Sequence, residues 1–181
     1  MAEIDPTTLL RGKLVDLRPL EADDATLLYR WANDPATAGA FDALQPRTLA
    51  QVQRQIAEQR ALTEEGGELL IARKDGTAVG VVQCHRVAYG AHSPAFNIGI
   101  EVAFDQRGHG YGAEAQRLLA DYLLYVFPIG RVEASTDVEN IPEQRALEKA
   151  GFTREGAARA ASWRGDRWHD MVVYSRVRGD E

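Results

Sequence analysis

The stretch IGIEVAFDQRGHGYGAEAQRLLADYLLYVF, from Ile98 to Phe127, decides the fold expected for this chain. It opens on an apolar run typical of a strand, passes glycines at positions 108, 110 and 112, and continues into a periodic segment. In that segment apolar side chains recur at the i, i+3, i+4, i+7 spacing of a helix that packs one face on a sheet. The stretch therefore predicts a strand, a glycine-rich turn and a helix packed against the strand.

Hydrophobic periodicity and turn residues predict the other elements. Before the glycines we expect a strand at 14–18, helices at 21–33 and 48–64, and strands at 68–73, 78–87 and 95–104. After the central helix we expect a strand at 131–137, a helix at 142–150 and strands at 153–161 and 168–177. Antiparallel hairpins in the middle and at the end, joined by a strand–helix–strand crossover, indicate a mixed α/β or α+β sheet.

Size and composition narrow the class of protein. The chain has 181 residues, 45% of them hydrophobic, so we expect one domain over 1–181 with a real core. A formal net charge of -6 argues against a nucleic-acid binder and favours a cationic small molecule or a basic peptide. Cys84 is the only cysteine, which excludes an intrachain disulfide. With no signal-peptide pattern and no long apolar run, we expect a cytoplasmic protein.

The three glycines have two interpretations. Free N–H groups at a helix N-terminus form an anion site, and glycines let a phosphate approach the main chain, with Arg107 adding a charged donor. The alternative is a turn that only closes a tight strand-to-helix connection. We favour the phosphate site because alternating glycines and an Arg together open a long helix. A dinucleotide or ATP module is a weaker alternative, since neither G-x-G-x-x-G nor G-K-S/T is present.

The motifs resemble the GNAT superfamily of acyl-CoA-dependent N-acetyltransferases, and within it the RimJ/RimL-type branch. The pyrophosphate loop of that family reads Q/R-x-x-G-x-G/A, which Arg107, Gly110 and Gly112 match. Three further segments also look like parts of this branch, namely LVDLRPLEADDATLLYRWANDP, TDVENIPEQRALEKAGF and WRGDRWHDMVVYSRV. The resemblance therefore covers nearly the whole chain.

The resemblance implies a mostly antiparallel sheet, split by a V-shaped gap between the parallel strands 95–104 and 131–137, with helices on both faces. It implies that acetyl-CoA lies in this gap, with its pyrophosphate on the loop amides and its pantetheine arm along the first parallel strand. Asn140 would contact the cofactor, although it stands where a helix cap is also expected, and both roles are compatible. The cofactor-binding residues expected on this ground are Val102, Ala103, Phe104, Arg107, Gly108, His109, Gly110, Tyr111, Gly112, Asn140 and Arg145.

The implied reaction is attack of a neutral amine on the acetyl thioester, which needs a proton acceptor. Asn97 and Glu101 share one face of strand 95–104. Many relatives carry Glu where this chain has Asn97, and an amide can orient an amine or a water but cannot take its proton. Glu101 is therefore the expected base, directly or through a water. The alternative is an ordinary exposed strand carboxylate.

Other polar and aromatic residues receive simpler interpretations. Relatives often carry Ser where this chain has Glu143, and an ionised Glu cannot donate a proton to the leaving thiolate. The acidic run that includes Asp24 is expected to be a solvated helix start. Trp163 and Trp168 are expected to pack across the closing hairpin. The four histidines lack metal-ligand spacing, so no metal is expected, and His85 is interpreted as a core or sheet-face residue.

These observations favour an acetyl-CoA-dependent N-acetyltransferase that acts on a primary amine of a small metabolite, an amino sugar or an antibiotic. One alternative is a protein N-terminal acetyltransferase of the ribosomal-protein type. Another is a non-catalytic acyl-CoA-binding protein, which the departures at 97 and 143 would favour. Helices 21–33 and 48–64, the Phe41–Asp42 connection and the closing hairpin should line the acceptor side. The expected partner is a small-molecule amine, with a homodimer as one option, and with no nucleic acid or membrane.

Overall fold

The computed structural model describes residues 8–59 and 61–179, which form an eight-stranded sheet in the order β1-β2-β3-β4-β5-β6-β8-β7. The strands are β1 (Leu10–Arg11), β2 (Val15–Pro19), β3 (Gly66–Arg73), β4 (Ala78–Ala88), β5 (Pro94–Val102), β6 (Arg131–Asp137), β7 (Thr153–Arg164) and β8 (Arg167–Val177). The helices are η1 (Ala22–Asp24), α1 (Ala25–Ala32), α2 (Pro35–Ala38), α3 (Leu49–Glu58), η2 (Phe104–Gln106), α4 (Tyr111–Val126) and α5 (Ile141–Lys149).

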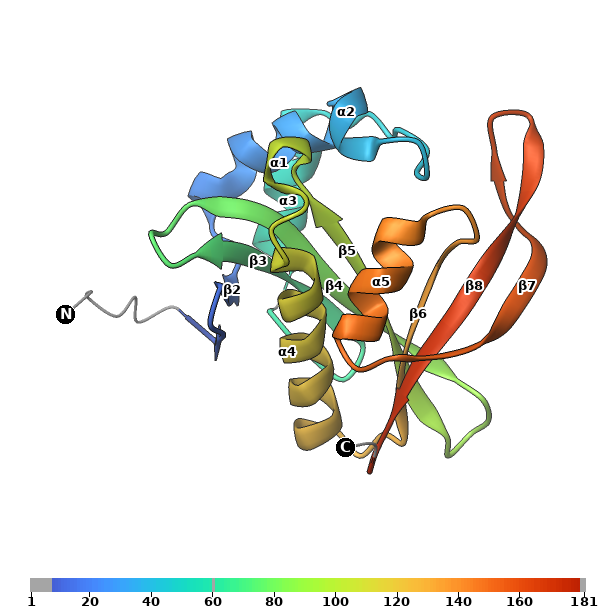
Figure 1. Cartoon of the computed structure of the whole chain (residues 1–181). Helices are drawn as coiled ribbons and strands as arrows, with labels where there is room; N and C mark the ends of the chain where they lie inside the picture. The colour runs from blue at the N-terminus through green and yellow to red at the C-terminus, as the bar shows by residue number, and fades with distance from the viewer. Residues whose placement is uncertain (1–7, 60, 180–181) are drawn as a thin grey trace.

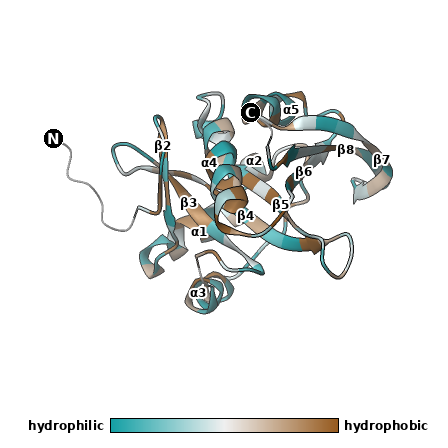
Figure 2. Cartoon of the chain, turned by 90° about the horizontal axis from the view of Figure 1, so that it is seen from below, coloured by the Kyte–Doolittle hydropathy of each residue, from teal (hydrophilic) through white to brown (hydrophobic). Residues whose placement is uncertain are grey.

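The helices lie on both faces of the sheet. Figure 2 shows α3 on one side of the strands and α5 on the other. The long helix α4 buries Ala115, Leu119 and Leu123 in the same core cluster as Phe96 and Ile98 of β5. Because side chains alternate along a strand, the neighbours of Phe96 and Ile98 point to the opposite face, where α1–α3 lie. No helix in the described parts of the chain is long and apolar enough to span a membrane.

The sheet is split between β5 and β6, the only parallel pair among the described strands. The two strands pair only where Phe96–Ile98 faces Val132–Ala134. Beyond this short register β5 continues to Val102 and β6 to Asp137, and Figure 1 shows them diverging toward the end that carries α2. Beyond the paired residues β5 and β6 no longer pair with each other, although the carbonyl of Val102 at the end of β5 accepts from Arg107 Nε. The mixed, mostly antiparallel split sheet expected from the sequence is confirmed.

The element boundaries differ from the sequence expectations in a few places. β1 and α2 were not expected, and each is short, with two and four residues. The helix expected at 48–64 begins where Thr48 caps it through the N–H of Gln51, but it ends at Glu58. Gln59 has an extended backbone at φ -82° and ψ 136°, which stops the helix six residues early.

The acidic run before α1 is not wholly solvated, so that expectation is wrong for Asp24. Its carboxylate is buried and accepts two hydrogen bonds from Arg18, Nη1 to Oδ2 at 2.8 Å and Nη2 to Oδ1 at 2.7 Å. Burial would raise the pKa of Asp24, but the hydrogen bonds from Arg18 and from the N–H of Glu21 outweigh it and lower that pKa. Asp24 therefore joins β2 to the start of α1. The residues next to Asp24 in the sequence do not predict this contact with Arg18.

The closing hairpin carries the expected cross-strand pair. Trp163 of β7 faces Trp168 of β8, and their ring centroids lie 5.4 Å apart in an edge-to-face arrangement. Both rings are exposed, whereas Tyr174 farther along β8 is fully buried. The prediction of cross-strand packing for the two tryptophans is confirmed.

Candidate active site

The turn between η2 and α4 has the backbone of an anion site. Gly108 and Gly110 have φ values of 81° and 84°, which residues other than glycine adopt only with backbone strain. The space where a Cβ of Gly108 would stand is open, with no heavy atom within 4 Å. The first N–H groups of α4 have no partner inside the helix, and no described carbonyl outside it accepts from Gly108–Gly112. The turn needs its glycines, and it also leaves donors free for a ligand.

Arg107 lies beside this turn, but its side chain is engaged with other main-chain groups. Its Nε donates to the carbonyl of Val102 at 2.9 Å, and its Nη2 donates to the carbonyl of Thr37 at the end of α2. The guanidinium also lies 5.8 Å from the ring centroid of Phe104. In this conformation Arg107 joins the end of β5 to α2, while its contribution to phosphate binding stays a prediction.

The other residues expected at the cofactor lie near the same turn or across the gap. Ala103 is buried and donates its N–H to the carbonyl of Val79 at 2.9 Å, which fixes the end of β5 on β4. The exposed ring of His109 stacks on Tyr111, with centroids 5.4 Å apart. Gly112 faces Ile100, whose Cδ1 would lie 3.4 Å from an added Cβ, so α4 packs closely on β5 there.

Asn140 lies on the opposite side of the gap, between β6 and α5. Its Oδ1 accepts from the N–H of Glu143 at 3.4 Å, and its Nδ2 donates to Thr136 Oγ1 at 3.0 Å. The helix-cap role is therefore confirmed, and the cofactor contact stays a prediction. Arg145 is exposed on α5.

Asn97 and Glu101 lie on the face of β5 that points away from α4. Glu101 pairs with Val81 of β4, and Asn97 lies between His85 of β4 and Glu133 of β6. His85 is exposed on this face, while the neighbouring Cys84 points into the core. Both candidate catalytic residues are thus half-buried on one face, four residues apart, and Glu101 lies beyond the part of β5 that pairs with β6.

The carboxyl of Glu101 belongs to a group of acidic side chains. Burial raises its pKa above the ordinary value, and the nearby charges of Asp42 and Glu68 raise it further, while Arg107 opposes them. Burial likewise raises the pKa of Asp42, on the connection between α2 and α3, and of Glu68 on β3. A cation placed among these carboxyls would be attracted, and a neutral amine would find a proton acceptor in Glu101.

Glu143 lies in the first turn of α5, the helix that follows β6. It hydrogen-bonds with Gln116, a fully buried residue of α4, and it feels the charge of Asp42. Burial, the largest cause, raises the pKa of Glu143 to about 7, although the hydrogen bond from Gln116 opposes this rise. Glu143 therefore binds a proton more readily than the exposed Glu that the sequence suggested.

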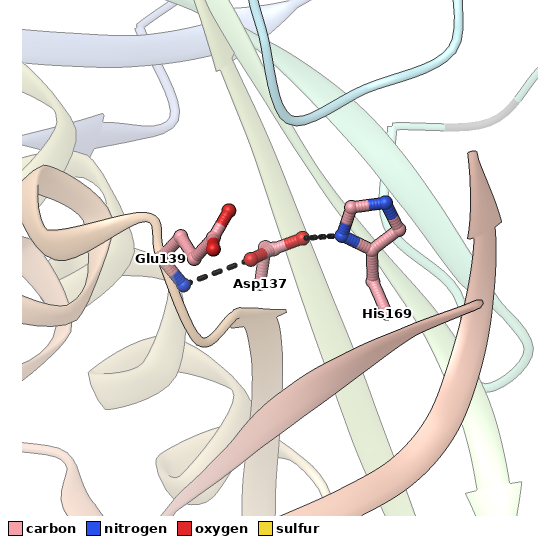
Figure 3. Close-up of side chains that lie close together, drawn as sticks. All are labelled: Asp137, Glu139 and His169. Carbon is pink, nitrogen blue, oxygen red and sulfur yellow. Dashed lines mark hydrogen bonds and ion pairs between the residues drawn. The ribbon is translucent and has the colours of Figure 1, made fainter. Parts of the chain in front are cut away.

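Three side chains meet where β6 ends, as Figure 3 shows. Asp137 accepts from the N–H of Glu139 at 2.8 Å, and its Oδ2 lies 3.2 Å from His169 Nδ1. A ligand atom of each of the three lies within 4.8 Å of the others, a spacing that could hold a metal ion. The same Oδ2 of Asp137, however, forms an ion pair with Arg164 Nη2 at 2.7 Å. This guanidinium already supplies a positive charge to the cluster. We assign no metal to the cluster.

Reasoning from the sequence missed Glu68, Gln116, Arg164 and Asp137 as neighbours of the gap. They come from β3, α4, β7 and β6, which are far apart in the chain. No spacing rule joins residues on four separate elements, and only the folded sheet brings them together. Asn97, Glu101, Asn140 and the loop glycines could be found because each falls inside one recognisable motif.

Comparison with known proteins gives one family. The family model described as an acetyltransferase (GNAT) domain matches residues 15–153. A probable N-acetyltransferase, YjcK of Bacillus subtilis (strain 168), is 29% identical over 180 residues, which is 96% of this chain and 99% of that protein. An aminoglycoside N(6')-acetyltransferase type 1 of Klebsiella pneumoniae is 29% identical over 154 residues, covering 78% of this chain and 75% of that protein.

A solved structure extends the similarity to the whole fold. The RimL ribosomal L7/L12 alpha-N-protein acetyltransferase in complex with coenzyme A superposes with a TM-score of 0.79 at 16% identity. The alignment covers 94% of this chain and 97% of that one. At this identity the likeness shows a shared fold and leaves the acceptor open.

Proposed function

Because the chain belongs to the GNAT acetyltransferase family, we propose that this N-acetyltransferase moves the acetyl group of acetyl-CoA to a primary amine of a small cationic molecule. The proposed acceptor classes are amino sugars, amine metabolites and aminoglycoside-type antibiotics. The observation that carries the proposal is the group of carboxyls, Asp42, Glu68 and Glu101, beside the split of the sheet.

The residues around the split suit acetyl-CoA. The N–H groups of Gly108–Gly112 would hold the pyrophosphate, because they are free and lie at the positive end of the α4 dipole. The unpaired edge of β5 up to Val102 would hold the extended arm by main-chain hydrogen bonds. When bound, the cofactor supplies an acetyl group activated as a thioester. The chain's own residues bind it, orient the amine and move protons.

Glu101 is the proposed proton acceptor. An alkyl ammonium with a pKa near 10 is mostly protonated at neutral pH, so a carboxylate beside it can both attract it and take its proton. The raised pKa of Glu101 makes it a stronger base than an exposed carboxylate. Asn97, two positions away on the same face, would orient the amine or a water.

One contact on the expected acceptor side favours a small acceptor over a protein N-terminus. Arg164 of the hairpin donates to the carbonyl of Phe41 at 2.7 Å, which joins β7 to the connection between α2 and α3. A polypeptide would need this side open along its length, whereas a small amine does not. The similarity to an aminoglycoside acetyltransferase of Klebsiella pneumoniae also supports this choice.

Two further features belong to the proposal. The whole chain 1–181 acts as one acetyltransferase domain, because a single sheet runs from Leu10 to Val177. The use of acetyl-CoA supports the cytoplasmic location expected from the sequence.

An activity screen tests the proposal. Acetyl-CoA is mixed with the protein and with aminoglycosides, polyamines, amino sugars or peptides with free N-termini, and released coenzyme A is measured with a thiol reagent. Cys84 does not disturb the readout, because burial raises the pKa of its thiol to about 11. Turnover on a small polyamine or amino sugar is expected. Turnover on peptides alone would favour the N-terminal alternative, and tight acetyl-CoA binding without turnover would favour a non-catalytic binder.

A further inference from the structure

A polar part of the sheet surface lies beside Glu101. Paired residues on neighbouring strands, and every second residue along one strand, point to the same face. Four side chains therefore share the face of Glu101, namely Gln83, His85, Asn97 and Ser135. Asn97 is half-buried and the other three are exposed. Within the described parts of the chain, no hydrogen bond joins any of these four side chains to another residue, so their donors and acceptors are available to a ligand.

Gln83 lies between two of the carboxyls that are proposed to attract the amine. It stands opposite Glu68 of β3 on one side and opposite Gly99 of β5 on the other. Glu101 is two residues beyond Gly99, which makes it a diagonal neighbour of Gln83. Diagonal neighbours on antiparallel strands lie about 7–8 Å apart, within reach of a long side chain. The amide of Gln83 can therefore reach a small molecule that is bound at Glu101.

The missing side chain of Gly99 gives the Gln83 amide its place. A Cβ added to Gly99 would stand 3.2 Å from Nε2, 3.5 Å from Cγ and 3.8 Å from Cδ of Gln83, and these are the three heavy atoms nearest to it. Gly99 has no positive φ, so its backbone conformation does not itself require glycine. Since Asn97 and Glu101 flank Gly99 on the same face, the side chain of Gln83 lies over β5 between them.

We propose that Gln83 selects an amine that carries a hydroxyl on the neighbouring carbon, as amino alcohols and amino sugars do. The proposal rests on the proposed acetyltransferase function and narrows its acceptor. With the nitrogen of the amine at Glu101, the hydroxyl on the next carbon meets the amide of Gln83. An amide offers both donors and an acceptor, and a hydroxyl is both as well, so the two groups match in either orientation of the amide.

A plain alkyl amine fits this surface less well. Its methylene groups would cover the amides of Gln83 and Asn97 and remove water from them without replacing the lost hydrogen bonds. A polar group that loses water and gains no partner is costly. For that reason a site built to bind a hydroxyl rejects an analogue that lacks one. The surface beside Glu101 thus favours an amino alcohol or an amino sugar over a polyamine.

The first experiment observes binding without turnover. Nitrogen-15 NMR of the protein saturated with coenzyme A, which has no acetyl group to transfer, follows the side-chain amide of Gln83. The signal is assigned by its absence from Gln83→Leu. Ethanolamine should shift this signal, whereas propylamine, in which a methyl replaces the hydroxyl, should shift it less at the same concentration. If both amines shift the signal equally, or neither shifts it, the proposal is overturned.

The second experiment compares the same two amines as acetyl acceptors. In the wild type, kcat/KM for ethanolamine should exceed that for propylamine about tenfold or more. Gln83→Leu should reduce this preference about tenfold, while the KM for acetyl-CoA stays unchanged. Because both proteins act on the same pair of amines, the intrinsic reactivity of each amine cancels from the comparison. Equal preferences in the two proteins would overturn the proposal, and a wild type that acetylates no amine would instead contradict the proposed function.

A matched pair of glycine variants tests the position of the Gln83 amide. Gly99→Ala keeps Gln83 but places a Cβ against its Nε2, so the preference for ethanolamine should fall toward that of Gln83→Leu. Gly156→Ala is the control, because Gly156 also lies in a strand and an added Cβ there has no heavy atom within 4 Å. The two changes Gly99→Ala and Gln83→Leu together should lose no more preference than Gln83→Leu alone. A Gly99→Ala protein with the wild-type preference would contradict the proposal.

Discussion

The guanidinium of Arg164 lies 2.7 Å from the buried carboxylate of Asp137, Nη2 to Oδ2. Only 1% of the Asp137 side chain is exposed, so this carboxylate depends on partners inside the protein. Burial alone would raise its pKa, but the N–H of Glu139 and the contact with Arg164 lower it. The same guanidinium donates to the carbonyl of Phe41, and thereby joins the closing hairpin to the connection between α2 and α3.

Removing Arg164 should therefore cost stability and loosen the acceptor side. Arg164→Met leaves a buried carboxylate with only His169 as its side-chain partner, and we expect unfolding to become easier by about 2–4 kcal/mol. The KM for the amine should rise more than the KM for acetyl-CoA. Chemical denaturation and steady-state kinetics measure the two effects. Arg167→Met is the matched control, because Arg167 is exposed and its carboxylate partner Glu139 lies 4.0 Å away. Equal losses in both variants would contradict a role for the Arg164–Asp137 pair.

Glu114 should stabilise the fold in a pH-dependent way. Its carboxylate accepts from the N–H groups of Lys13 at 2.9 Å, Leu14 at 2.6 Å and Val15 at 2.8 Å, which ties the start of β2 to α4. Burial would raise its pKa, but these three hydrogen bonds lower it. The stabilisation is therefore complete above the ordinary pKa of 4.5 and is lost as pH falls through the lower folded value.

Glu114→Gln should lower the free energy of unfolding by about 2 kcal/mol at pH 7. The difference from the wild type should shrink below pH 4, where the wild-type carboxyl also becomes protonated. Urea unfolding at pH 7 and pH 3 measures it, with the exposed Glu64→Gln as control. A difference that is the same at both pH values would mean that the charge of Glu114 is unimportant.

The loop glycines allow a matched test of the phosphate site. Gly108 has φ 81° and Gly76, in the β3–β4 turn, has φ 85°, and neither has a heavy atom within 4 Å of an added Cβ. Gly108→Val and Gly76→Val should thus suffer similar backbone strain, about 1–2 kcal/mol each. Only Gly108→Val should lose acetyl-CoA affinity, by about tenfold or more, in isothermal titration calorimetry. If both variants keep the wild-type affinity, the glycine at 108 serves only the turn.

Glu101→Gln should remove the base and keep the shape of the site. The rate at neutral pH should fall by about 10²-fold or more, and the loss should shrink as pH rises because more of the amine arrives neutral. Acetyl-CoA affinity should barely change. Near-wild-type turnover at neutral pH, where chemistry limits the rate, would leave Glu101 as an ordinary strand carboxylate.

The charge of Asp42 gives a second test of the same base. Since Asp42 raises the pKa of Glu101, Asp42→Asn should make Glu101 ionise at lower pH. The acidic limb of the pH–rate profile should then move to lower pH, because the ionised base is present over a wider range. A limb that moves to higher pH or stays in place would show that Glu101 does not control it.

Much of the fold could be read from local patterns, for reasons visible in single segments. The period of apolar residues after Gly112 requires a helix with one buried face, and α4 buries Ala115, Leu119 and Leu123 as that pattern predicts. Thr48 and Asn140 stand at helix starts, where their side chains accept from the first turn. The short elements β1 and α2 were missed because two and four residues are too few to show a period.

The sequence by itself determined the family, the order of the longer strands and helices, and the turn at Gly108 and Gly110, since each depends on residues that are neighbours in the chain. Tertiary structure alone decided which charges meet. Glu143 is an unremarkable acid in a helix, and its pKa is raised to about 7 only because the packed chain buries it. Arg164 contacts Asp137 and Phe41 only when β7 and β8 pair into the sheet beside β6. Electrostatic energy depends on distance and on exclusion of water, and both are properties of the packed molecule and not of sequence spacing.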